Sequence, residues 1–184
     1  MVRFLALSSL LLLLGACQAQ QVPRDFDTSR DFTTYRDWSW AQPAVTYRPD
    51  DDPRIQSDLM TQRIQEAVSG QLDARGLRPA QGDAAGDLLV RVYMVVDERQ
   101  DTVTTHYGGV GYWGRWGGPM MAQTRPVYYQ VATLQIDLLD AQDRQLVWRG
   151  STSEMLGEGR SSPAERQQTT YEMVRKVLSG YPPY

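Results

Sequence analysis

Cysteine, histidine and lysine are almost missing from this chain of 184 residues, which has one of each. A single cysteine cannot form an intramolecular disulfide, so packing of the core has to hold the fold together. A single histidine leaves little scope for a histidine-rich metal site. Arginine supplies nearly all positive charge, and the net charge is −3. Nucleic-acid binding calls for a clustered basic face, so we expect no nucleic-acid partner.

The chain also lacks an apolar run long enough to span a membrane. Its longest run, Phe4 to Leu14, falls short of the roughly 20 apolar residues that a spanning helix needs. This run follows the positively charged Arg3 and fits the hydrophobic part of a signal peptide. It ends in Leu14-Gly15-Ala16-Cys17, which resembles the lipobox of bacterial lipoprotein signal peptides. We therefore predict that Cys17 carries diacylglycerol after cleavage of the precursor, because two acyl chains anchor a protein stably.

These features predict a location and three segments. Residues 1–16 are the lipoprotein signal peptide, residues 17–23 are the lipidated cysteine and its tether, and residues 24–184 form one domain. Gln18 follows the cysteine, where an aspartate would resemble an inner-membrane retention signal. We expect the outer membrane, on its periplasmic side, with surface exposure as the other option. An ordinary secretory signal with an incidental Cys17 is the alternative.

The first half of the mature chain predicts a strand and a long helix. Trp38-Ser39-Trp40 alternates like a strand with one buried face. A proline-containing loop should follow over residues 43–52. Asp52 is the predicted N-cap and Pro53 the first residue of a helix that runs to about Arg75. One face of this helix is apolar, with Met60, Ile64, Ala67, Val68 and Leu72. Gly76 is the expected residue after its C-cap.

The second half predicts three strands and a second helix. Alternating apolar residues mark strands over residues 87–97 and 127–139, and a turn over residues 140–143 leads to a strand over residues 145–153. Ser162, Pro163 and Glu165 form a capping box that starts a helix ending near Gly180. Its predicted buried residues are Tyr171, Val174 and Leu178. We expect an α+β fold, with a mainly antiparallel sheet of about four to five strands and two helices on one face.

Four stretches together resemble a known family. They are residues 25–40 with their aromatic residues, residues 72–90, the glycine-rich residues 108–118, and residues 132–150 with the Leu146-Val147-Trp148-Arg149-Gly150 end. This combination is similar to the domain-of-unknown-function 4136 family of bacterial envelope lipoproteins. The resemblance covers nearly the whole mature chain. It implies an α+β lipoprotein domain and transfers no catalytic residues.

The most distinctive segment is the glycine- and aromatic-rich loop over residues 107–121. Tyrosine and tryptophan rings offer flat amphipathic faces for a sugar, a membrane interface or a protein pocket, and an intervening arginine can pair with phosphate or stack on a ring. The candidate partner-binding residues are Tyr107, Tyr112, Trp113, Arg115 and Trp116. A mobile connection whose aromatic rings fold back on the sheet is an equally weighted interpretation.

No set of residues has the spacing of a catalytic or metal site. His106 is the one histidine, and Asp97 or Asp101 would have to be its partner in a triad. Asp137 alternates with apolar neighbours and should point away from the core into solvent, while Asp140 and Asp143 are turn formers. We therefore expect no catalytic residue, metal or cofactor. The leading hypothesis is a non-enzymatic binding or assembly module that meets the membrane through Cys17 and an envelope protein or glycan through the loop. An envelope hydrolase acting on glycan or lipid is the alternative.

Overall fold

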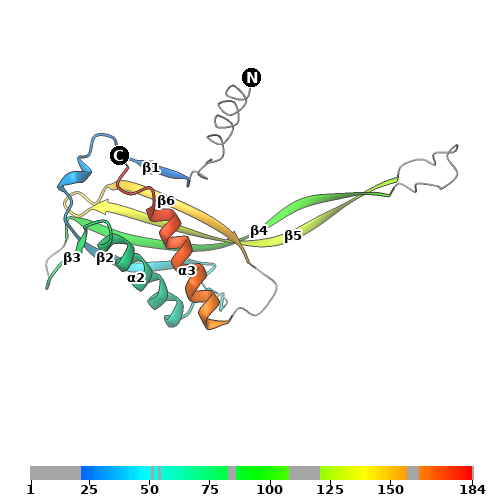
Figure 1. Cartoon of the computed structure of the whole chain (residues 1–184), viewed down its shortest axis with the longest axis horizontal. Coiled ribbons are helices and arrows are strands. Elements are labelled where there is room, and N and C mark those ends of the chain that lie inside the picture. The colour runs from blue at the N-terminus through cyan, green and yellow to red at the C-terminus, as the bar shows by residue number, and fades with distance from the viewer. Residues whose placement is uncertain are drawn as a thin grey trace, which may run out of the picture.

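The computed structural model describes residues 22–50, 52–53, 55–82, 86–107, 121–156 and 162–183. These residues form one sheet, two α-helices and a short 3-10 helix (Figure 1). In chain order the elements are β1 (Arg24–Phe26), η2 (Phe32–Thr34), β2 (Asp37–Arg48), α2 (Asp58–Asp73), β3 (Arg78–Pro79), β4 (Leu88–Tyr107), β5 (Met121–Asp140), β6 (Leu146–Met155) and α3 (Pro163–Leu178). The predicted α+β class is confirmed.

The sheet differs from the prediction in size and direction. It has six strands among the described residues, in the order β1-β6-β5-β4-β2-β3, and it is mixed. The strands β1, β6, β5 and β4 pair with one another antiparallel in that order. The strand β2 runs parallel to both β4 and β3. Parallel neighbours need a crossover connection, and α2 supplies it between β2 and β4. The expectation of four to five mainly antiparallel strands was therefore wrong.

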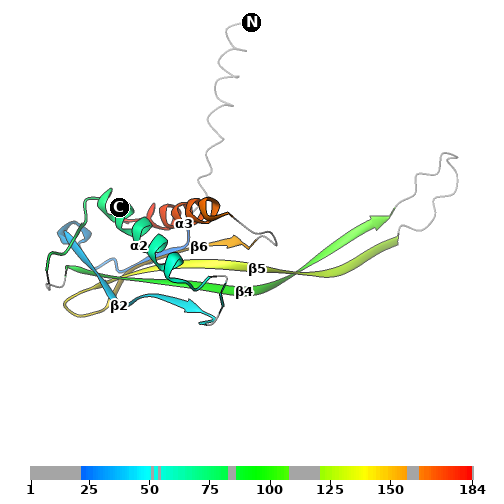
Figure 2. The same cartoon turned by 90° about the horizontal axis from the view of Figure 1, so that it is seen from below.

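Both α-helices cover the same face of the sheet, as predicted (Figure 2). The helix α2 begins at the N-cap Ser57, whose side chain accepts a hydrogen bond from the amide of Met60, rather than at Asp52. Gly76, at φ +86°, ends it as expected, and the amide of Leu77 donates back to the carbonyl of Leu72. The fully buried side chains of the core come from both helices and from the sheet: Ile64, Val68, Leu72, Val90, Val92, Leu134, Ile136, Leu138, Trp148, Val174 and Leu178.

The capping box of α3 is confirmed, with Ser162 and Glu165 exchanging side-chain and backbone hydrogen bonds. Tyr171 was predicted to be buried but is 44% exposed. The buried stripe of α3 instead runs through Met173, Val174, Val177 and Leu178. Tyr171 lies on the side of the helix that borders α2, where its hydroxyl accepts a hydrogen bond from Gln71.

Two β-bulges explain two local features of the sheet, namely Pro43 inside β2 and the outward-facing Leu146 of β6. The strand β2 continues through Pro43, which was placed in a loop, because the ladder with β4 is interrupted between Trp40 and Val45. A proline there removes no ladder hydrogen bond. The second bulge, at Leu138 and Leu139, gives β6 an extra residue opposite β5. As a result Leu146 is turned outward and is 38% exposed, while Val147 and Trp148 are both buried.

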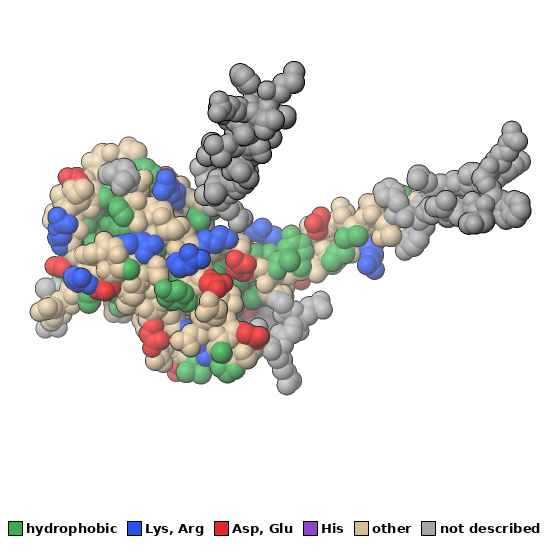
Figure 3. Space-filling model, viewed as in Figure 1, with side chains coloured by type: hydrophobic (Ala, Val, Ile, Leu, Met, Phe, Trp, Pro, Cys, Tyr) green, Lys and Arg blue, Asp and Glu red, His purple; other side chains and the backbone are tan. Residues whose placement is uncertain are grey.

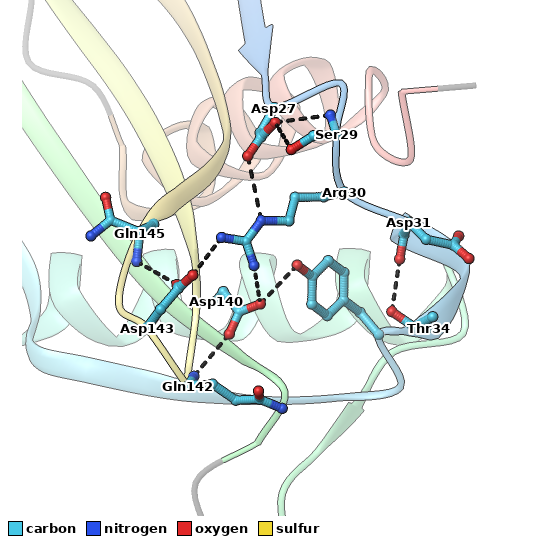
Figure 4. A network of polar contacts seen from close by, with 10 residues as sticks. Asp27, Ser29, Arg30, Asp31, Thr34, Asp140, Gln142, Asp143 and Gln145 are labelled. Atoms are coloured by element: carbon cyan, nitrogen blue, oxygen red, sulfur yellow. Dashed lines mark hydrogen bonds and ion pairs between the residues drawn. The ribbon is translucent and has the colours of Figure 1, made fainter.

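An arginine fixes the segment between β1 and β2 to the turn between β5 and β6 (Figure 4). The guanidinium of Arg30 donates to Asp140 at 2.9 Å, to Asp143 at 2.5 Å and to Asp27 at 3.4 Å. Asp140 and Asp143 also accept from the backbone amides of Gln142 and Gln145, as turn-forming residues do. Two segments that lie more than 100 residues apart in the chain are thereby held together.

The interaction with Arg30 makes part of the stability depend on pH. The hydrogen bond from Arg30 lowers the pKa of Asp143 below its usual value, so folding favours its ionised form. This contribution is fully present above the unfolded pKa near 4 and is lost as pH falls through the lower, folded pKa. Urea unfolding should show that Asp143→Asn is less stable than the parent at neutral pH and that the difference shrinks below about pH 4. Asp101→Asn, which removes an exposed carboxylate on β4, is the control and should leave the pH dependence unchanged.

Gly150 of β6 lets α3 pack closely on the sheet. A Cβ at this position would lie 2.5 Å from Cη2 of Trp148 and 3.0 Å from Cγ1 of Val177. Gly150→Ala should therefore reduce the free energy of unfolding by about 1–3 kcal/mol, as overpacked cores do. Gly70→Ala is the control, because nothing lies within 4 Å of a Cβ there in the middle of α2. That substitution should stabilise the protein by about 0.5–1 kcal/mol. Equal effects in chemical denaturation would contradict the packing argument.

Candidate functional site

The strands β4 and β5 are much longer than their neighbours in the sheet. They pair in continuous register from Leu88 opposite Asp140 to Tyr107 opposite Met121. The pairing of β2 with β4 ends at Val95, and that of β6 with β5 begins at Val131. Beyond these points the two strands form a ribbon that projects from the body (Figures 1 and 2). We call residues 98–107 and 121–130 the arm; ten residues of strand extend about 33 Å.

Side chains on the arm are open to solvent on both faces. Every residue in the ranges 98–105 and 122–128 is exposed, including Val103, Val127 and Tyr128, which are 43%, 36% and 58% exposed. Hydrophobic and charged side chains are visible along the ribbon in Figure 3. An isolated two-stranded ribbon is only marginally stable in water. The arm is held through its continuity with the sheet and by cross-strand contacts such as the 3.0 Å hydrogen bond between Thr104 and Thr124.

The arm carries the predicted binding loop at its end. The backbone of Tyr107 pairs with that of Met121, so residues 108–120 join the two strands of the ribbon. Tyr112, Trp113, Arg115 and Trp116 lie outside the described residues, as do the side chain of Tyr107 and the lipidation site Cys17. The arm was not predicted, because the alternating apolar pattern that marks β4 extends only over residues 87–97. The available signal was the β-branched run Thr102-Val103-Thr104-Thr105.

The candidate residues for hydrolysis all lie on β4. Asp97, Asp101 and His106 occupy one extended strand, so Asp101 and His106 are separated by roughly 16 Å of backbone. A general base has to lie within hydrogen-bond reach of its partner. The fold therefore does not bring these three residues together.

Asp137 lies on the open face of the sheet, away from the helices, but the prediction that it points into solvent was wrong. It is only 4% exposed and lies between Arg91 of β4 and Arg149 of β6, which are its register neighbours. Arg149 donates to both carboxylate oxygens, at 2.7 and 2.6 Å, and Gln135 donates at 3.0 Å. This pairing raises the pKa of Arg149. With both oxygens occupied, Asp137 is a structural ion-pair partner.

The surface cavities formed by described residues include a larger and a smaller one. The larger, about 320 Å³, is a polar groove between α2 and α3 that includes Arg63, Glu66, Gln168 and Tyr171. The second, about 210 Å³, lies at the end of the body opposite the arm. No group of three or more histidine, cysteine, aspartate or glutamate side chains in the described parts of the chain is arranged to hold a metal ion. Nor does any helix there have the length and apolar character needed to cross a membrane.

Solved structures with a TM-score above 0.5 share this fold at low sequence identity. A DUF4136 family protein from Bacteroides thetaiotaomicron has a TM-score of 0.51 at 16% identity, and the match covers 88% of this chain and 95% of that one. A PDZ domain protein from Parabacteroides distasonis has a TM-score of 0.53 at 14% identity over 86% of this chain, which spans about a third (34%) of that protein. The PelC dodecamer of Paraburkholderia phytofirmans is more distant, with a TM-score of 0.45 at 13% identity, over 86% of this chain and 94% of that one.

A family model described as a domain of unknown function, DUF4136, matches residues 22–183. No curated protein matches the sequence. The matched region contains every described element of the sheet and both α-helices. The chain therefore belongs to the DUF4136 family.

Proposed function

We propose that this protein is a lipid-anchored envelope lipoprotein that acts as a non-enzymatic binding or assembly module, and that the arm with its connecting loop is the docking element. The observation that carries the proposal is the ribbon beyond Val95 and Val131. Beyond residue 95 of β4 and residue 130 of β5, neither edge pairs with a third strand among the described residues, so both edges present backbone N–H and C=O groups. The side chains of residues 98–105 and 122–128 are exposed. Such edges bind extended segments of other chains by strand addition.

The distribution of charged residues along the arm favours contact with a partner. Most of its charged residues lie near the body, at Glu98, Arg99 and Asp101. The outer half is rich in threonine and has Arg125 as its charged residue. Charged side chains protect exposed strand edges from unwanted pairing. An edge that lacks them over its outer half is suited to pairing with a specific partner.

The proposed anchor and the arm determine how the module would meet its surroundings. A tether of residues 17–23 leads directly into β1, so the body would stay close to the membrane surface. The arm would extend the reach of the protein by about 30 Å from the body. The loop with Tyr112, Trp113 and Trp116 is attached to the arm at Tyr107 and Met121, and a protein pocket, a glycan or a membrane interface can accept such aromatic side chains.

Docking through the arm can be tested by site-specific photo-crosslinking in the envelope. A photoreactive residue at Tyr128, which is 58% exposed on the arm, should give a discrete crosslinked product. The matched control is Leu59 at the start of α2, which is 62% exposed. Since Tyr107 and Met121 lie opposite each other, an Asn-Gly turn can replace residues 108–120 and close the hairpin.

The shortened protein should keep the melting temperature of the parent and lose the Tyr128 product by about tenfold or more. A further variant with serine at Tyr112, Trp113 and Trp116 keeps the loop length and tests the aromatic rings alone. Undiminished crosslinking in the shortened protein would exclude the loop as the docking element. Products of equal yield from Tyr128 and Leu59 would exclude the arm.

The anchor is tested separately with Cys17→Ser. Serine has no thiol for the diacylglyceryl group, so the variant should accumulate as uncleaved precursor or leave its normal membrane fraction. Metabolic labelling with palmitate should mark the parent protein and not the variant. Unchanged labelling and fractionation of Cys17→Ser would refute the lipoprotein assignment.

A further inference from the structure

The smaller cavity has the features of a binding site and lies away from the proposed docking arm. It lies where η2, the end of α2 and the turn after α3 meet, at the opposite end of the body from the arm (Figure 1). Its volume is about 210 Å³. Its principal lining residues are Phe32, Tyr35, Arg36, Arg75, Leu77 and Tyr181. Two arginines and several apolar side chains therefore share one small space.

Among the described residues, the positive charge of Arg75 has no counter-ion. Its Nε donates to the carbonyl oxygens of Leu178 at 2.7 Å and Tyr181 at 3.1 Å. Its Nη1 donates to the backbone oxygen of Gln71 at 2.7 Å and to the side-chain oxygen of Gln71 at 2.8 Å. All four acceptors are neutral, and no carboxylate among the described residues pairs with Arg75. Its Nη2 makes no hydrogen bond to any described residue.

The environment of Arg75 makes this missing counter-ion significant. The side chain is half-buried, and burial lowers the pKa of its guanidinium. A cation removed from water is normally paired with an anion as well as hydrogen-bonded. Nε of Arg75 closes the end of α3 and Nη1 bonds to Gln71 of α2, so neither contact uses Nη2. The free Nη2 is the group that an incoming anion would meet.

The other walls of the cavity indicate what such an anion would carry. Phe32 is 4% exposed and Leu77 is 3% exposed, and both present apolar surface. Phe32 meets Tyr35 and Tyr181 edge to face, with ring centroids 5.8 and 5.9 Å apart. Edge-to-face contacts are a preferred arrangement for aromatic rings, so a further ring can join this cluster favourably.

Two polar side chains complete the lining. Tyr181 is 5% exposed, and its hydroxyl has no hydrogen-bond partner in the part of the chain that the structure describes. Burial raises the pKa of this hydroxyl, so it remains a neutral donor. Arg36 is exposed, and its side chain forms no ion pair with a described residue. A ligand acceptor in the cavity would gain a hydrogen bond from this hydroxyl.

We propose that this cavity binds a small carboxylate that carries an aromatic or compact apolar group. The carboxylate accepts from Nη2 of Arg75, with Arg36 at the rim adding charge, and the apolar group packs against Phe32 and Leu77. A carboxylate suits a site with one free guanidinium nitrogen and mainly apolar walls. This inference goes beyond the proposed docking function and does not depend on it.

Benzoate is a suitable probe because it combines both features in a molecule small enough for the cavity. Binding to the full mature domain is followed by NMR, through the backbone amides of Leu77 and Tyr181 and the Nε–Hε signal of Arg75. Benzamide, which keeps the ring without the charge, and inorganic phosphate, which keeps the charge without the ring, are the comparison ligands. Benzoate should shift these signals and bind at least about tenfold more tightly than either, a difference of about 1.4 kcal/mol.

Three variants locate the charge requirement. Arg75→Gln should weaken benzoate binding by about tenfold, and Arg36→Gln by a few-fold, since rim charges contribute less than buried ones. Arg63→Gln removes an arginine from the groove between α2 and α3 and should leave binding unchanged.

Any of three results would overturn the assignment: no shift at Leu77 and Tyr181, equal binding of benzamide or phosphate, or full affinity in a folded Arg75→Gln. If that variant does not fold, the benzoate-to-benzamide ratio and Arg36→Gln decide the question, and a ratio near one overturns the proposal. Crosslinking from Tyr128 should be unaffected, so the cavity and the arm succeed or fail independently.

Discussion

The uninterrupted antiparallel pairing of β4 with β5 is the interaction on which the rest of this structure depends. It fixes the register over 20 residues of each strand and gives every other strand its place. On one side β6 adds to β5, and on the other β2 adds to β4. The apolar half of the ladder, from Leu88 to Met94 with its partners, carries both helices. The polar half has nothing to cover it among the described residues, and it forms the arm.

The two ends of the body are built on different principles. Near the arm, the fold depends on backbone pairing between exposed strands. At the opposite end it depends on side chains that satisfy helix ends and turns, since Arg75 closes the end of α3 and Arg30 joins the β5–β6 turn to the segment after β1. The two arginines differ in one respect. Three carboxylates surround Arg30, whereas the acceptors of Arg75 among the described residues are all neutral. This contrast within one protein distinguishes a structural cluster from a candidate ligand site.

Local sequence patterns predicted the parts of this fold that depend on local physics. The capping box at Ser162, the helix end at Gly76 and the turn at Asp140 and Asp143 all involve contacts within a few residues, and all are confirmed. Three of the errors have a different origin. That β2 is parallel to β4, that Pro43 fits a bulge and that β4 continues to Tyr107 all follow from pairing with distant strands. The cavity at Arg75 was equally inaccessible, because its lining comes from three segments that meet only in the folded chain.

The sheet protects its edges unevenly, and this is the strongest structural argument for a docking role of the arm. The outer strands of the body are very short: β1 has three residues and β3 has two, with Arg78 and Pro79 as its members. Short edges, charge and proline are devices that prevent unwanted strand pairing. The same chain leaves two much longer ribbon edges open beyond Val95 and Val131. The edges of β2 beyond Trp38 and of β6 beyond Ser151 also pair with no further strand among the described residues, but there the sheet carries the helices on one face. The ribbon is open at its edges and exposed at its side chains over residues 98–105 and 122–128, and the proposed docking role would give it a partner.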